Sequence, residues 1–206
     1  MIEKSPSERR YEKNRQTILE AARSIIQEQG VQALSMRTLA EKADYSASAL
    51  YKYFENKEAI ISALRREGFE LSAQISQGRV HPDMPLDEMM RVMWQSYLEF
   101  ARRYPAHYML IMNPADDVPA SFNEFLADPQ FRGLMDFATG AVASEQIHLP
   151  EGAEPVHLAM MMWFLAHGAA MLQLTMLRNC PAEFAEMSEG VIDMLNNMIF
   201  HAELSK

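Results

Sequence analysis

The chain has 206 residues, of which 49% are hydrophobic and 23% are charged, and its formal net charge is −9. This length suits one or two compact domains, and the composition excludes collagen, coiled-coil rods and disordered chains. The net negative charge excludes a protein that coats nucleic acid with its whole surface. The single cysteine, Cys180, and an N-terminus without an apolar run predict a cytoplasmic protein without an intrachain disulfide.

The charge is unevenly distributed along the chain. Up to Lys57 there are ten Lys and Arg against eight Asp and Glu, a net charge of +2, whereas the remainder carries −11. A slightly basic segment beside an acidic body is typical of a module that contacts phosphate next to a domain with another task. Chance explains the asymmetry equally well, so charge alone does not establish a phosphate-binding module.

Apolar residues recur at three- and four-residue steps through the first quarter of the chain, which predicts short helices with capped ends. The first helix covers 10–29 and ends at Gly30. A second is capped by Ser35 and runs through Ala43, a third begins after Ser46, and Asn56 caps a fourth that runs to about residue 77.

The segment 78–85, GRVHPDMP, has the composition of a linker. The rest of the chain shows helical periodicity interrupted by prolines, without alternating apolar runs or a fixed repeat. The fold class is therefore predicted to be all-α. The further predicted helices are 86–103, 105–112, 119–127, 130–147, 155–178 and 182–203.

Two short helices joined by a few residues match the helix-turn-helix pattern. The segment 34–60, LSMRTLAEKADYSASALYKYFENKEAI, resembles the signature of the tetracycline-repressor (TetR) family of bacterial transcription regulators. The resemblance extends from Arg15 to about Leu64, and its most specific elements are Leu39-Ala40, Leu50-Tyr51 with Phe54, and Lys57-Glu58. It implies a helix-turn-helix DNA-binding domain over 10–57 and a helical ligand-binding and dimerisation domain over 58–206.

The resemblance implies that the third helix enters the major groove of DNA while nearby helix ends hold phosphates. Ala47 and Ser48 would face bases, Tyr51, Tyr53 and Lys57 would contact phosphates, and Arg37 could bind guanine with two hydrogen bonds. The alternative is that the tyrosines belong to the core and the lysine is solvated. The candidate DNA-binding residues are Ser35, Arg37, Ser46, Ala47, Ser48, Tyr51, Lys52, Tyr53 and Lys57.

Two features of the helix-turn-helix segment concern its turn and its contacts with bases. Asp44 occupies the turn position that glycine usually fills, and aspartate tolerates a positive φ less well than glycine does. Residues 47–49 are all small, so specificity would come from thymine methyl groups, water bridges and DNA shape.

The segment 155–177 contains no charged side chain and is long enough to span a membrane. His157, His167 and Gln173 argue against insertion, so we expect a helix buried partly against a second copy of the chain. With the last helix it would form a four-helix dimer interface. The candidate dimerisation residues are Met171, Leu174, Phe184, Met187, Val191, Leu195 and Met198.

Seventeen methionines, nearly all beyond residue 80, suit an adaptable apolar cavity. Trp163 to Gly168 resembles the W-x-x-x-H-G pattern of one branch of the family. His167 could contact a ligand or be a hydrogen-bonded core imidazole, and ordinary core packing is the alternative for the others. The candidate ligand-binding residues are Trp94, Tyr97, Tyr108, Met112, Phe122, Phe125, Met135, Phe137, Trp163 and His167.

The sequence therefore predicts a homodimeric repressor that binds a pseudo-palindromic double-stranded operator and is released by an apolar small-molecule inducer. The alternative is a DNA-binding regulator without an inducer, whose C-terminal body binds a protein partner. No phosphate loop, zinc motif or nucleophile elbow appears, so we expect no enzymatic activity, no cofactor and no metal.

Overall fold

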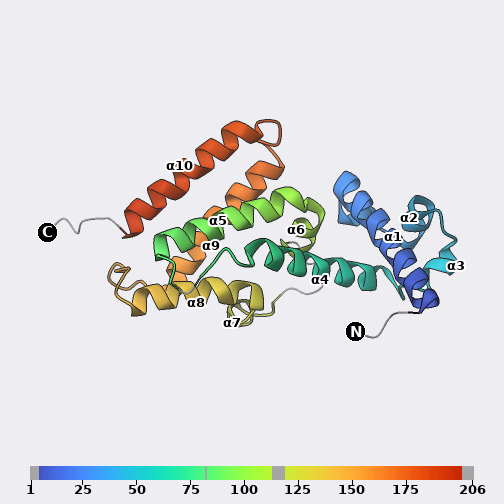
Figure 1. Ribbon diagram of the computed structural model, residues 1–206, viewed down its shortest axis with the longest axis horizontal. Helices are drawn as coiled ribbons and strands as arrows, with labels where there is room; N and C mark the ends of the chain where they lie inside the picture. The colour runs from blue at the N-terminus through green and yellow to red at the C-terminus, as the bar shows by residue number, and fades with distance from the viewer. Residues whose placement is uncertain (1–4, 82, 113–118, 201–206) are drawn as a thin grey trace. The chain divides into compact units, whose positions relative to one another are not determined.

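A computed structural model describes residues 5–81, 83–112 and 119–200, with the backbone alone for 129 and 130. Over these residues every regular element is a helix, which confirms the predicted all-α fold (Figure 1). The chain divides into two compact units. Unit 1 comprises Met1–Leu71 and Tyr104–Pro114, and unit 2 comprises Ser72–Arg103 and Ala115–Lys206.

Unit 1 contains the helices that the sequence predicts for the DNA-binding domain, and the sixth helix of the chain in addition. Its first helix starts earlier than predicted, because Ser5 and Glu8 form a reciprocal capping box ahead of Pro6. Its elements are α1 (Pro6–Gln29), the 3₁₀ turn η1 (Val31–Ala33), α2 (Met36–Ala43), α3 (Ala47–Leu50), most of α4 (Lys57–Ser76) and α6 (Pro105–Met112).

The core of unit 1 is formed by the inward faces of these helices. Ile18, Leu39, Leu50 and Leu64 are completely or almost completely buried, one from each of α1 to α4. Burying each such side chain contributes about 1.5–3 kcal/mol, so the short helices α2 and α3 depend on this common core rather than on their own length.

The sixth helix belongs to this core too, which differs from the predicted boundary at residue 57. Ala106 and Leu110 of α6 are buried in the same cluster as the α1 to α4 residues. The close approach of α6 to α4 depends on Gly68, because a Cβ there would lie 2.9 Å from Ile111 Cδ1. The spacing of α6 alone could not reveal this, since its apolar residues have no preferred face.

A cluster of Arg23, Glu67 and His107 lies beside the contact between α4 and α6. Glu67 of α4 accepts a hydrogen bond from Arg23 of α1 at 2.5 Å, and its other oxygen is 3.5 Å from Nε2 of His107. His107 is 3% exposed, and burial lowers its pKa although the carboxylate opposes that change. The imidazole is therefore neutral near pH 7.

Unit 2 is a bundle of longer helices. In it α9 packs against α5 and α8, and α10 packs against α5 and contacts α9. Its elements are the end of α4, α5 (Leu86–Arg103), α7 (Phe122–Leu126), α8 (Pro129–Ala143), α9 (Pro155–Leu174) and α10 (Pro181–Phe200). The predicted extension of the last helix to 203 lies outside the described residues.

Polar contacts fix α5 to α10 in this bundle. Trp94 Nε1 donates to the Ser188 hydroxyl at 2.9 Å in the interior, and Arg91 pairs with Asp193 and Glu189 at the surface. These contacts hold one face of α10 against its own chain.

Candidate nucleic-acid interface

The turn between α2 and α3 has the left-handed backbone that its position requires. Asp44 adopts φ 57° and ψ 45°, and its N–H caps the end of α2 by donating to the Ala40 carbonyl. The prediction that aspartate takes the place of glycine at a positive φ is confirmed. Because Asp is more tolerant of this region than most residues, α2 and α3 still meet at a tight joint.

Serine caps begin both helices of the motif, as predicted. The Ser35 hydroxyl accepts a hydrogen bond from the Thr38 N–H at 3.1 Å, and the Ser46 hydroxyl accepts one from the Ala49 N–H at 3.2 Å. Each cap is worth about 1 kcal/mol, and it leaves backbone N–H groups of the first turn pointing outward.

The outer face of α3 presents small and polar groups. Ala47, Ser48, Tyr51 and Lys52 are exposed, whereas Leu50 is fully buried. The helix ends sooner than the Leu50 and Phe54 spacing indicated, and residues 51–53 form a turn in which Lys52 and Tyr53 donate to carbonyls three residues back. Leu50 and Phe54 are nevertheless both buried, as predicted.

Arg37 lies on the exposed side of α2. Its Nε donates to Glu41 at 3.2 Å, and both side chains are largely exposed. An exposed pair of this kind is worth little in water, so the guanidinium can exchange the carboxylate for a stronger acceptor at low cost. Arg37, Glu41, Ala47 and Tyr51 border a surface hollow of about 470 Å³ between α2 and α3.

Tyr53 differs from the other candidates because it is half-buried. Its ring stacks on Tyr11 with 4.9 Å between centroids and meets Tyr45 edge-on at 6.3 Å. Asn14 Nδ2 donates to its phenol oxygen at 2.9 Å. The contribution of α1 was missed from the sequence, although Tyr11, Asn14 and Ile18 follow one another at steps of three and four residues along one side of this helix.

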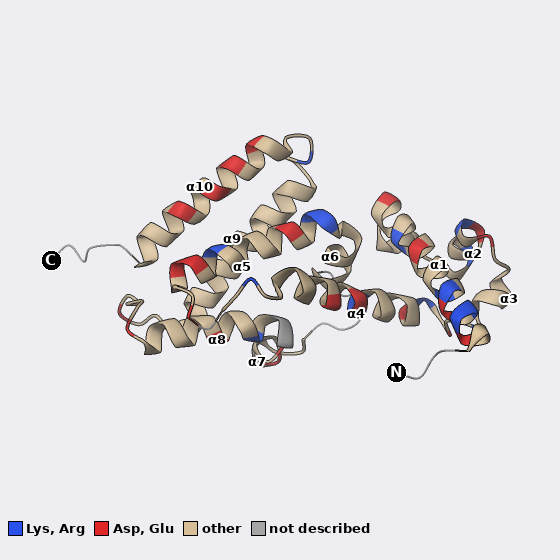
Figure 2. Cartoon of the chain, in the orientation of Figure 1, with Lys and Arg blue, Asp and Glu red and all other residues tan. Residues whose placement is uncertain are grey.

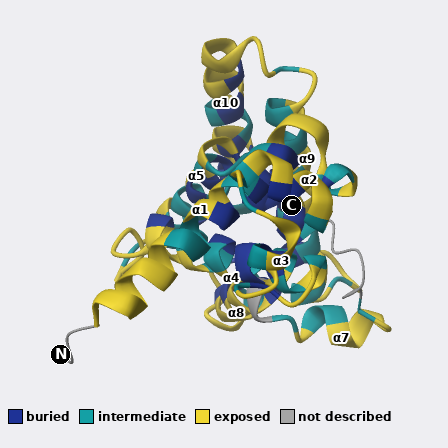
Figure 3. Ribbon diagram, turned by 90° about the vertical axis from the view of Figure 1, so that its right-hand side faces the viewer, coloured by how far each residue is buried: buried dark blue, intermediate teal, exposed yellow. Residues whose placement is uncertain are grey.

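Lys57 starts α4, where the backbone has a partial positive charge. Asn56 Oδ1 accepts a hydrogen bond from the Ala59 N–H at 2.8 Å, which confirms the predicted cap. Basic residues also line the first turns of α1 (Figure 2), and these turns are exposed (Figure 3). Unit 1 therefore offers a phosphate both charged side chains and the partial positive charge at the N-terminus of α4.

The candidate ligand-binding residues do not form one group. Tyr97 and His167 form a hydrogen bond of 3.3 Å, and His167 stacks on Trp163 with 5.3 Å between centroids. Phe125 lies 5.6 Å from Trp163. Burial lowers the pKa of His167, which favours the neutral imidazole in this hydrogen bond.

The other candidates have different surroundings. Trp94 is bonded to Ser188, Phe137 is buried, Met135 is half-buried, and Phe122 is 56% exposed beside Phe125. Tyr108 and Met112 belong to α6 and therefore to unit 1. The sequence missed Phe131, whose ring lies 4.9 Å from that of Phe125.

The candidate dimerisation residues are divided by the structure. Phe184 and Leu195 are buried within their own chain, so their inclusion on a surface stripe is corrected. The physical reason is that α10 turns these residues, with Ser188 and Ile192, towards the bundle. Met187 and Met198 are exposed, and Met171, Leu174 and Val191 are half-buried.

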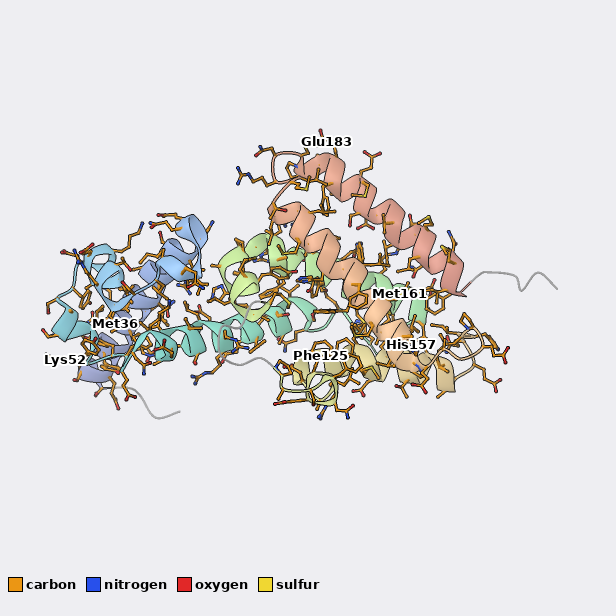
Figure 4. The ribbon with its side chains drawn as sticks, turned by 180° about the vertical axis from the view of Figure 1, so that it is seen from behind. Met36, Lys52, Phe125, His157, Met161 and Glu183 are labelled. Carbon is orange, nitrogen blue, oxygen red and sulfur yellow. The ribbon has the colours of Figure 1, made fainter. Side chains whose placement is uncertain are left out.

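An apolar surface on α9 and α10 remains exposed. We call it the α9/α10 face, and its exposed side chains are Met161, Phe164, Leu165, Leu172, Met187, Met194 and Met198 (Figure 4 labels Met161). By length and composition α9 could also cross a membrane, although the core helix of a soluble protein can be equally long and apolar; 22% of its most apolar 18-residue stretch is buried.

Two family models match the chain. Residues 18–64 match the model for bacterial regulatory proteins of the tetR family, and residues 90–195 match the tetracyclin repressor-like C-terminal domain. The first range contains the helix-turn-helix with its caps, and the second covers about half of the chain.

Curated relatives agree with this assignment. The chain is 27% identical over 164 residues to the HTH-type transcriptional repressor KstR of Mycobacterium tuberculosis, covering 76% of this chain and 73% of that protein. It is 35% identical over 83 residues to KstR of Rhodococcus jostii, covering 39% and 38%.

Solved structures share the fold. A regulatory protein in the tetR family from Rhodococcus RHA1 superimposes with a TM-score of 0.71 at 16% identity, covering 91% of this chain and 97% of that chain. The fatty acid degradation regulator FadR from Bacillus halodurans gives 0.68 at 14% identity, covering 94% and 96%. With the capped helix-turn-helix and both domain matches in place, the chain belongs to the TetR family and is a DNA-binding transcriptional regulator.

Proposed function

We propose that this regulator is a cytoplasmic, homodimeric repressor that binds a pseudo-palindromic operator and leaves it when an apolar small molecule binds to unit 2. The observation that carries the DNA-binding part is the geometry of α2 and α3. Their exposed face holds Arg37, Ala47, Ser48 and Tyr51, while Leu50, the one large apolar side chain of α3, is buried. Repression is supported by the name that the KstR relatives carry.

The proposed contacts divide into two kinds. Ala47, Ser48 and Arg37 would meet base edges in the major groove, and Arg37 can exchange Glu41 for guanine O6 and N7. The remaining candidates, Ser35, Ser46, Tyr51, Lys52, Tyr53 and Lys57, would hold phosphates and fix the position of the protein on the duplex.

A second copy of the chain is supported by the α9/α10 face. Phe164 is 60% exposed, Met194 is 59% exposed and Met198 is 63% exposed, whereas a soluble monomer seldom exposes several large apolar side chains on adjacent helices. Gly168 and Gly190 have open space at the Cβ position, so another helix could approach there. Pairing two copies places two reading helices about 34–36 Å apart in operator-bound dimers of this motif.

The inducer is proposed to be apolar because of the aromatic side chains in unit 2. Ring contacts join Phe125 of α7 to Phe131 of α8 and to Trp163 of α9, and Trp163 in turn stacks on His167. The Tyr97 hydroxyl and the His167 imidazole give this cluster a polar end. In a dimer, the ligand would prefer the conformation in which the two DNA-binding units are too far apart to fit the operator. DNA affinity would then fall by the ratio of the ligand's affinities for this conformation and for the DNA-binding one.

The test is titration of a fluorescent duplex from the DNA upstream of the gene, with random duplex as competitor, at two salt concentrations. Wild type is expected to bind the upstream duplex in preference to random DNA and to bind more weakly at higher salt. Tyr51→Ala and Lys57→Ala should lose most of this affinity. Arg132→Ala, which removes an exposed positive charge from unit 2, is the matched control.

Two outcomes would contradict the proposal. Failure of wild type to prefer any duplex, including those from a random-library selection, would exclude sequence-specific binding. Specific binding that no apolar ligand weakens, together with capture of a protein by unit 2, would favour a regulator without an inducer.

A further inference from the structure

Asn14 of α1 contacts the phenol of Tyr53, which lies just after α3 in the chain. Its Nδ2 donates to the phenol oxygen at 2.9 Å. A phenol oxygen accepts hydrogen bonds and also carries one proton to donate. In the bond to Asn14 the phenol oxygen is the acceptor, so the phenol proton takes no part in that bond and can be donated to a different acceptor.

The ring of Tyr53 is held as well as its oxygen. Tyr11 stacks on it at 4.9 Å and Tyr45 meets its edge at 6.3 Å, so contacts from α1 and from the turn before α3 fix the plane of the ring. Tyr53 is half-buried, and the described residues give its hydroxyl Asn14 as hydrogen-bond partner. A side chain fixed in this way loses little conformational freedom when it binds a ligand.

We propose that Asn14 is a positioning residue for DNA binding, which orients the Tyr53 hydroxyl so that it donates its proton to a phosphate of the duplex. The inference rests on the proposed function and adds α1 to the residues that determine DNA affinity. Asn14 itself does not touch the DNA. It acts by fixing the polarity of one hydrogen bond, because an amide N–H can only donate.

The polarity makes the proposal testable with one substitution. In Asn14→Asp the carboxylate can only accept, so the phenol O–H donates its hydrogen bond to the carboxylate and no longer donates to a phosphate. The new negative charge would also repel DNA whatever Tyr53 does. Repeating the substitution with Tyr53→Phe measures that repulsion alone, because no phenol remains to be reoriented.

The experiment measures affinity for a duplex of random sequence at low salt, since phosphate contacts form on any duplex. Wild type, Asn14→Asp, Tyr53→Phe and the double variant are compared. We expect Asn14→Asp to weaken binding about tenfold more when Tyr53 is present than with Tyr53→Phe, as for a hydrogen bond to a charged group. Tyr53→Phe alone should weaken binding by a similar factor.

Asn14→Leu serves as a second variant, because it removes the donor without adding charge. Its effect should also shrink when combined with Tyr53→Phe. Circular dichroism and the unfolding midpoint show whether each variant folds. Equal losses from Asn14→Asp in the two backgrounds would overturn the inference while leaving the proposed function intact, because wild type would still prefer its operator.

Discussion

Gly68 of α4 and His107 of α6 approach so closely that a Cβ built on the glycine would lie 3.0 Å from the histidine Cβ. Ile111 Cδ1 would lie 2.9 Å from the same atom. Gly68→Ala should therefore destabilise the protein by about 1–3 kcal/mol, although alanine favours a helix. Urea unfolding measures the loss.

Gly140→Ala is the matched control for that substitution. Gly140 lies in the last turn of α8, and a Cβ there would have nothing within 4 Å. The helix propensity of alanine then acts alone and should stabilise by about 0.5–1 kcal/mol. A Gly68→Ala protein as stable as the control would show that the contact between α4 and α6 is looser than described.

The buried His107 should make the protein less stable in mild acid. Burial lowers its pKa, so the unfolded chain binds the proton more tightly than the folded chain does. Stability is then complete above the unfolded pKa of about 6.5 and falls as the pH drops below it, until the folded group is protonated as well.

His107→Gln removes this proton-linked loss. The free energy of unfolding of the variant should fall less than that of wild type between about pH 7 and pH 5.5. The exposed His148→Gln controls for the exchange of an imidazole for an amide. Parallel pH profiles for wild type and His107→Gln would contradict the assignment.

The left-handed turn at Asp44 predicts a stability series. With φ at 57°, Asp44→Gly should raise the free energy of unfolding by up to about 1 kcal/mol, and Asp44→Val should lower it by about 1–2 kcal/mol. Glu145 has φ 58°, so Glu145→Gly should stabilise in the same direction. Thermal unfolding checks the order, and stabilisation by valine would refute the turn geometry.

The α9/α10 face predicts the effect of charge on assembly. Phe164→Glu and Met194→Glu should convert a dimer into a monomer in light scattering, because each would bury an unpaired carboxylate between copies. Phe122→Glu is the control, since Phe122 is as exposed but lies on α7. Dimers that survive both substitutions would place the interface elsewhere.

Much of unit 1 could be predicted from the sequence, because local signals determine it. Ser35, Ser46 and Asn56 cap their helices as predicted, and Leu50 faces inward. Each of these depends on residues within one or two turns of the same helix. The shortening of α3 escaped prediction because the Phe54 spacing fits a turn as well as a helix.

Contacts between distant segments could not be predicted in this way. The hydrogen bond from Asn14 to Tyr53 joins residues 39 positions apart, and α6 joins unit 1 only in three dimensions. In α10, Phe184 and Leu195 share a face with Met187 by spacing, but packing against α5 selects which side is buried. The spacing of apolar residues predicts which face of a helix is apolar, but not which other helix covers that face.

Selection from a random duplex library with wild type and Arg37→Ala measures whether α2 and α3 read a specific operator. Wild type should enrich two inverted half-sites about 10 base pairs apart or a multiple of that distance. Arg37→Ala should enrich the same sequence with a guanine relaxed in each half-site, a loss of about 1–3 kcal/mol of discrimination. Failure of wild type to enrich any shared sequence would exclude sequence-specific reading by α2 and α3.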